Sequence, residues 1–105
     1  MKLLTKAIEA KLLKASNGDT SQKLPIIVKF FNPTGAGTWY ITSGEQVEGD
    51  WIFFGLCDIH EPELGYVALS DLRSFKGRFG LGIERDLHFE NKFLDTNKFP
   101  VEVVS

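Results

Sequence analysis

The chain is poor in cysteine, in net charge and in long apolar runs. Its single cysteine, Cys57, cannot form an internal disulfide and has no second thiolate beside it to complete a metal site. The net charge of -2 gives no general field that would attract nucleic acid. No uninterrupted apolar run approaches the ~20 residues that a bilayer span needs, and Lys6 and Glu9 interrupt the start, where a signal peptide would be apolar. We therefore expect a protein of the reducing cytoplasm, with no membrane association and with nucleic acid disfavoured as a partner.

Aromatic residues, by contrast, are plentiful. Nine Phe, two Trp and two Tyr supply large buried areas, so a small domain can build a core without disulfides. A hydrophobic content of 43% and a charged content of 25% are those of an ordinary globular protein. The length of 105 residues suits one domain, so we expect a single domain over residues 1–105.

The spacing of apolar residues predicts a helix followed by a series of strands. Leu4, Ile8 and Leu12 recur at helical spacing, with Thr5 as the expected N-cap and Ser16-Asn17-Gly18 as the stop. Strands are expected at 26–31, 38–42, 51–58, 66–69 and 82–90, a loop at 60–65 and a short helix at 70–77.

These elements predict an α+β fold. We expect a single, mainly antiparallel sheet of about five strands, with the N-terminal helix and the short helix packed on it. The parts of the domain would be the helix at 1–17, the sheet and short helix at 25–90, and a C-terminal tail or edge strand at 91–105.

Charged residues recur at every second position in the last expected strand. Glu84, Asp86, His88 and Glu90 would project to one face, about 7 Å apart along the strand. Carboxylates and imidazoles bind metals and move protons, so Glu84, Asp86 and His88 are the catalytic candidates, with His60 as a complement from the loop after residue 58. A single strand seldom points three side chains at one ion, so a solvated face is the favoured interpretation and we predict no metal site and no cofactor.

A second set of residues is a candidate for binding. Arg85 alternates with apolar residues, so it lies either at the rim, with its stem on the core, or in an ion pair with Glu63 or Asp71. Most aromatic side chains are expected in the core, but one that is exposed would indicate a protein partner, because Trp and Tyr are common interface anchors. The binding candidates are Arg85, Glu63, Tyr66 and Trp39.

Two further features carry weaker signals. Gly77-Arg-Phe-Gly-Leu-Gly82 matches no phosphate-binding motif, although Arg73, Lys76 and Arg78 could give a weak, salt-sensitive contact with nucleic acid. Cys57 lies in an apolar strand, which is expected to raise its pKa and keep its thiol inert.

Several motifs together are similar to those of a known bacterial family. They are Val28-Lys-Phe-Phe-Asn-Pro33, Thr38-Trp-Tyr40, Phe53-Phe-Gly-Leu56, Glu63-Leu-Gly-Tyr-Val-Ala-Leu-Ser-Asp-Leu72 and Gly80-Leu-Gly-Ile-Glu-Arg-Asp-Leu-His-Phe89. From Leu3 to about Phe93 the chain resembles the family called domain of unknown function 2958. Arg78 and Gly82 depart from the family pattern, which has proline at these positions in many relatives.

That resemblance implies a small bacterial protein of the kind encoded on plasmids and integrated conjugative elements, with a cytoplasmic accessory role and no assigned activity. We therefore predict a non-enzymatic module that binds or regulates an unidentified protein partner. The alternatives are a small metal-dependent or acid–base enzyme that uses Glu84, Asp86 and His88, and a weak nucleic-acid binder.

Overall fold

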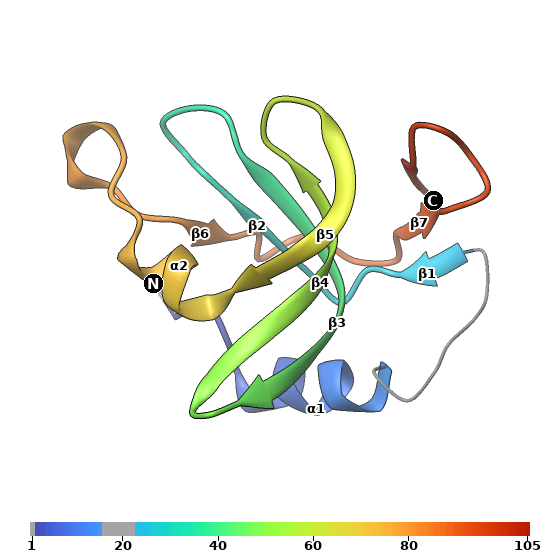
Figure 1. Cartoon of the computed structure of the whole chain (residues 1–105), viewed down its shortest axis with the longest axis horizontal. Coiled ribbons are helices and arrows are strands. Elements are labelled where there is room, and N and C mark those ends of the chain that lie inside the picture. Colours follow the sequence, from blue (N-terminus) through green and yellow to red (C-terminus); the bar gives the residue numbers. More distant parts are fainter. Residues whose placement is uncertain (1, 16–22) are drawn as a thin grey trace.

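The N-terminal helix is present as predicted. The computed structural model describes residues 2–15 and 23–105, and helix α1 spans Lys6–Ala15 (Figure 1). Thr5 is its N-cap, since the amide of Ile8 donates to the Thr5 hydroxyl oxygen at 3.2 Å. Leu12 on the inward face is fully buried. The expected stop at residues 16–18 lies outside the described residues.

A five-stranded antiparallel sheet forms the centre of the molecule. Its strands stand in the order β5-β4-β3-β2-β6. In chain order the strands are β2 (Val28–Phe31), β3 (Thr38–Val47), β4 (Asp50–Asp58), β5 (Pro62–Ala68) and β6 (Glu84–Arg85).

The two faces of this sheet follow from side-chain alternation along each strand. Phe30, Trp39 and Phe53 share the face that α1 and helix α2 (Leu69–Ser74) cover, here called the helical face. The main core lies there, and it also takes in Leu3, Leu4, Leu12, Val28, Ile41, Trp51, Leu69, Leu72 and Ile83. Tyr40 and Leu56 point to the opposite, rear face.

The single-sheet prediction is wrong, because a second sheet covers the rear face. Three short strands, β1 (Lys23–Pro25), β7 (Phe93–Asp95) and β8 (Glu102–Val104), form an antiparallel sheet in the order β1-β7-β8. Leu94 of β7 is fully buried in a separate core with Ile26 and Leu56. Each of these strands has three residues, which is too short to show the alternation that marks a strand in sequence.

The predicted fifth strand at 82–90 is also much shorter than expected. Only Glu84 and Arg85 pair with β2. The Asp86 carboxylate then accepts the amide of His88 at 2.9 Å, a side-chain turn that ends the extended backbone. The alternating charges therefore do not stand in one regular row.

The predicted loop at 60–65 is wrong from Pro62 onward. β5 begins at Pro62 and pairs with β4 along seven residues, from Pro62 opposite Asp58 to Ala68 opposite Ile52. Proline is tolerated at the first residue of an edge strand because its missing amide costs no ladder hydrogen bond there. The sheet consequently ends in a long edge strand that precedes α2 directly.

Candidate functional site

The predicted catalytic residues Glu84, Asp86 and His88 line one open hollow of about 330 Å³, together with Lys29. Asp86 forms an ion pair with Lys29 at 3.5 Å, and the Lys29 ammonium also lies 5.4 Å from the centre of the Phe89 ring and 5.7 Å from that of Tyr40. Glu84 lies on β6, and His88 is exposed in the turn that follows it. Asp86 is therefore engaged in a surface cluster on the rear face.

His60 lies far from these residues along the sheet. One register row runs from Pro62 through Asp58, Thr38 and Phe31 to Glu84. Four strand spacings of about 4.8 Å separate its ends, about 19 Å measured along the sheet, and His60 lies in the turn before Pro62. Across residues 2–15 and 23–105, no three His, Cys, Asp or Glu side chains are grouped closely enough to hold a metal ion.

Arg85 connects β6 to the N-terminal segment. Its guanidinium donates to the carbonyl oxygen of Leu3 at 3.4 Å, and the side chain is half-buried. Glu63, one of its predicted partners, stands in the same register row as Arg85 but on β5, at the opposite edge of the sheet. Arg85 therefore connects β6 to the N-terminal segment by a hydrogen bond between residues that are distant in sequence.

The other three binding candidates come together. Trp39, Glu63 and Tyr66 line an open, mainly apolar hollow of about 320 Å³ between β5, α2 and the loop that follows α2. We call it the β5 groove. Its remaining lining residues are Cys57, Ile59, Gly65, Val67, Asp71, Leu72, Phe75 and Ile83.

One of the lining residues, Gly65, faces a second glycine, Gly55, across β5 and β4. Gly55 pairs with Gly65 on the helical face of the sheet. A Cβ at Gly55 would lie 1.9 Å from the Tyr40 carbonyl oxygen, so the fold itself requires glycine there. A Cβ at Gly65 would meet nothing within 4 Å, so packing gives no reason for its missing side chain. A glycine in a strand with open space above it is typical of a place where another backbone or a ligand approaches.

The thiol that lines the groove, Cys57, has a raised pKa. Burial raises the pKa of Cys57, and the negative charge of Glu63 raises it further. The direction of this pKa shift is the one expected from its apolar strand. Because Cys57 is the single cysteine of the chain and lines the groove, its alkylation at alkaline pH reports on whether the groove is open.

A carboxylate from β4 holds the helix that forms one wall of the groove. Asp50 accepts the Ser70 hydroxyl at 2.6 Å, the Trp51 amide at 2.8 Å and the Ser70 amide at 3.1 Å. The α2 N-cap residue, Ala68, has no side-chain oxygen to do this. The hydrogen bond from the Ser70 hydroxyl, followed by those from the two amides, lowers the pKa of Asp50 below its ordinary value of 3.8.

Replacement of Asp50 by alanine is therefore expected to lower the melting temperature at neutral pH by several degrees. Since the pKa of Asp50 is lower in the folded state, its contribution is complete above pH 3.8 and declines as the pH falls through the folded-state value. Thermal melts of both proteins from pH 7 to pH 2 should converge at the acid end. Asp58→Ala, at the exposed far end of β4, is the matched control, and an equal loss in both variants would contradict the capping role.

The loop between α2 and β6 extends the apolar surface beyond the groove. It projects from the sheet at the upper left of Figure 1, and its turn is held by the Gly77 amide, which donates to the Leu81 carbonyl oxygen at 2.7 Å. Phe79 at its tip is 88% exposed and has a left-handed φ of 62°, which is uncommon for a bulky residue. Its aromatic ring is therefore held out into solvent by a tightly bonded turn.

The basic residues of this region line a different hollow. Lys2, Arg73 and Lys76 border a volume of about 470 Å³ that also includes Glu84. Arg78 is exposed in the loop and does not line it. Sequence reasoning grouped Arg73, Lys76 and Arg78, and it missed Lys2, because only the fold brings residue 2 to this place.

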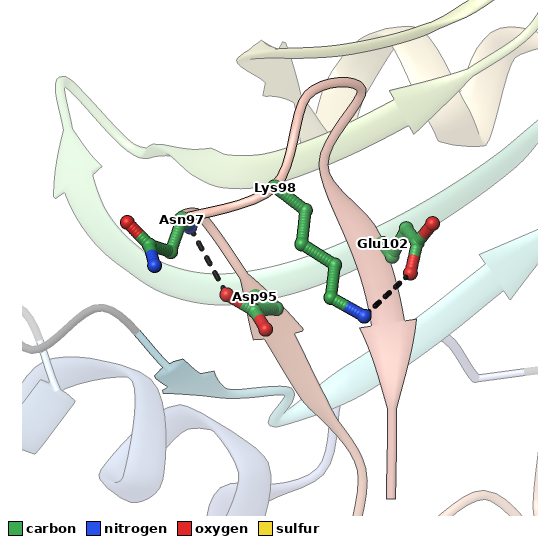
Figure 2. Close-up of polar contacts among 4 residues, drawn as sticks. All are labelled: Asp95, Asn97, Lys98 and Glu102. Atoms are coloured by element: carbon green, nitrogen blue, oxygen red, sulfur yellow. Dashed lines mark hydrogen bonds and ion pairs between the residues drawn. The ribbon is translucent and has the colours of Figure 1, made fainter.

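The C-terminal hairpin, shown in Figure 2, is held by local polar contacts. The Asp95 carboxylate accepts the Asn97 amide at 3.0 Å, and the Lys98 ammonium lies 3.1 Å from the Glu102 carboxylate. The hydrogen bond that Lys98 donates to Glu102, with the negative charge of Glu102, raises the pKa of Lys98. These contacts fix the turn between β7 and β8, at which Phe99 is fully exposed.

Comparison with known families decides the relationship suggested by the sequence motifs. The family described as "Protein of unknown function (DUF2958)" matches residues 3–97. The chain belongs to this family. The DUF2958 match includes every strand of the five-stranded sheet and all residues of the β5 groove. Comparison with curated proteins and with solved structures gave no match. Of the helices in the described part of the chain, none combines the length and the apolar content of a membrane span.

Proposed function

We propose that this DUF2958 protein is a non-enzymatic module that binds or regulates another protein, and that it takes a segment of that partner into the β5 groove. The proposal includes a cytoplasmic accessory role in a bacterial mobile element, which is supported by the family resemblance alone. The observation that carries the binding role is the groove itself: it is apolar, open at the surface, and floored by a glycine that packing does not require.

The surroundings of the groove support a protein as the partner. Tyr66 is 74% exposed, and its ring packs on Phe54 of the rear face, with the ring centroids 5.0 Å apart, so it lies at the same edge of the sheet as the groove but on the other face. Ile59 and Phe75 at the rim are 43% and 38% exposed. Exposed aromatic and apolar side chains around a hollow are the usual anchors of protein interfaces.

Both alternatives have less support. The residues of the enzyme proposal, Glu84, Asp86 and His88, line one open hollow, but Asp86 is paired with Lys29, and His60 lies at the other edge of the sheet. Weak nucleic-acid binding through Arg73, Lys76 and Arg78 would use three exposed cations, and such contacts bring salt-sensitive affinity without sequence recognition.

A peptide-display selection tests the proposed function. Random short peptides are selected on the native protein, and the enriched peptides are then compared on Gly65→Val, in which a branched side chain fills the groove floor. Since a Cβ at Gly65 meets open space and valine favours strands, this variant should fold with an unchanged melting temperature. We expect peptides that bind the native protein, bind Gly65→Val at least about tenfold more weakly, and slow the alkylation of Cys57.

The selection has clear contrary outcomes. Failure to enrich any peptide, or peptides that bind the two proteins equally and leave Cys57 alkylation unchanged, would count against the groove as a protein-binding site. Glu90→Ala, which removes an exposed charge outside the groove, serves as the control that should bind like the native protein.

A further inference from the structure

We infer that the partner segment binds as an added β-strand along the outer edge of β5, and that it is a basic segment with alternating apolar side chains. This inference rests on the proposed function and specifies how the groove would be occupied. It depends on three features of the edge: the direction of its backbone groups, the hollows on both of its faces, and the charge around it.

Hydrogen-bond alternation shows which backbone groups of the sheet point outward. In an antiparallel pair, successive residues of a strand bond to opposite neighbours. The backbone amide of Asn32 donates to the Gly37 carbonyl oxygen at 2.8 Å. Counting back from this bond in steps of two shows which residues of β2 form hydrogen bonds with β3. The backbone amide of Asp86 donates to the Lys29 carbonyl oxygen at 3.0 Å, so Lys29 forms its hydrogen bonds on the β6 side. This agrees with the alternation, because Lys29 is an odd number of residues from Asn32.

The same alternation of hydrogen bonds continues from β3 through β4 to β5. Tyr40 must bond to β4 through its register partner Leu56, because its neighbour Trp39 bonds to β2. On β4, Gly55 then bonds to β5 through its partner Gly65. Glu63, Gly65 and Val67 are thus the β5 residues whose amides and carbonyls are used by the ladder.

Leu64 and Tyr66 therefore direct their amides and carbonyls away from the sheet. β5 is an edge strand, and within residues 2–15 and 23–105 no backbone hydrogen bond from a loop or helix reaches residues 62–68 from outside. Leu64 is 39% and Tyr66 74% exposed. Such an edge, long, apolar and unpaired, is the template that peptide segments use when they add to a sheet.

Hollows flank this edge on both faces. The β5 groove lies on the helical face beside Glu63 and Gly65, and a second hollow of about 260 Å³ lies beside Tyr66, between Phe54 and Glu45. Because side chains of a strand alternate between faces, successive residues of an added strand would enter the two hollows in turn. The apolar groove suits the apolar residues, and the second, more polar hollow with Glu45 suits a cation.

The charge of the surrounding strands selects a basic occupant. Residues 30–72, which include β3, β4 and β5, contain seven acidic residues and no Lys or Arg. The seven are Glu45, Glu48, Asp50, Asp58, Glu61, Glu63 and Asp71. Pairing with the same edge of a second copy would bring two such acidic regions together, which repulsion disfavours, whereas Lys or Arg side chains would neutralise them.

Amide exchange measured by NMR tests the geometry directly. In the free protein the amides of Leu64 and Tyr66 should exchange with solvent much faster than those of Gly65 and Val67. Addition of a short, amidated peptide of alternating valine and lysine should slow exchange at Leu64 and Tyr66 by about tenfold at saturation, and this binding should weaken with added salt. Unchanged exchange at both amides in the presence of this peptide would overturn the inference.

A pair of variants at Leu64 isolates the backbone contribution. Leu64→Pro removes the outward amide without disturbing the inward ladder, whereas Leu64→Ala shortens the side chain and keeps the amide. We expect the valine–lysine peptide to bind Leu64→Ala nearly as the native protein and to bind Leu64→Pro about tenfold more weakly, with both variants folded by circular dichroism.

The outcomes separate this inference from the proposed function. If Gly65→Val abolishes binding while Leu64→Pro and Leu64→Ala bind equally, the groove is the binding site but strand addition is wrong. If neither Gly65→Val nor Leu64→Pro alters binding, both proposals fail. A third outcome is slow amide exchange at Leu64 and Tyr66 without peptide, which slows further as the protein concentration rises. It would show that a second copy of the chain, and not a partner segment, pairs with this edge.

Discussion

Gly55→Ala should destabilise the protein severely. The added Cβ would lie 1.9 Å from the carbonyl oxygen and 2.8 Å from the carbonyl carbon of Tyr40. Both atoms belong to the neighbouring strand, so the backbones of β3 and β4 would have to separate at the centre of the sheet. We expect a loss of about 3 kcal/mol or more in the free energy of unfolding, which corresponds to a melting temperature lower by roughly 15 °C.

Gly65→Ala is the matched control for this prediction. The two glycines are register partners, yet an added Cβ at Gly65 meets open space. Alanine there should leave stability unchanged or raise it slightly, because glycine loses more conformational freedom on folding. Denaturant titration measures the free energy of unfolding of the two variants. Similar losses of stability in both would contradict the prediction, because only Gly55 lies close to the Tyr40 carbonyl group.

Leu94→Ala should destabilise the chain almost as much, through the second core. The side chain is fully buried between the small sheet and the rear face of the large one, with Ile26 and Leu56 beside it. Removal of a buried leucine side chain leaves a cavity, and the expected cost is about 3 kcal/mol.

The control for Leu94 is Leu13→Ala on the outer face of α1, where the side chain is 46% exposed. Its expected cost is within about 0.5 kcal/mol. If Leu94→Ala unfolded in urea at the same midpoint as the native protein, residues 93–104 would contribute nothing to the core, and the small sheet would be only loosely attached.

The sequence predicted those elements whose pattern is long enough to be read. The helix at Lys6–Ala15 follows from its apolar spacing and its threonine cap, and β3 and β4 follow from runs of aromatic and β-branched residues. β5 was partly missed because Pro62 and Gly65 look like loop residues. Each has a positional reason, since Pro62 begins an edge strand and Gly65 faces Gly55.

The second sheet could not be predicted from local patterns. Its strands have three residues each, and what makes them strands is pairing with each other and burial of Leu94. The alternating run at 84–90 misled for a related reason, because an aspartate that bonds a backbone amide two residues later ends the strand regardless of alternation.

The candidate site was predicted in part. The sequence predicts Trp39, Glu63 and Tyr66 as binding residues, and all three line the β5 groove. The groove itself depends on α2 and the following loop, which come over β5 from the next part of the chain. The one local signal that sequence reasoning left unused is the pair of glycines in two apolar stretches, Gly55 and Gly65.

The pairing of β1 with β7 bears on how the chain reaches its native state. Lys23 stands opposite Asp95, so this contact closes a loop of about 70 residues, whereas the β3–β4 hairpin closes with two. Distant contacts form late in folding because their entropic cost must be met before they stabilise anything. We therefore expect the hairpins of the large sheet to assemble first, and the rear core to consolidate as the final step, when β7 reaches β1.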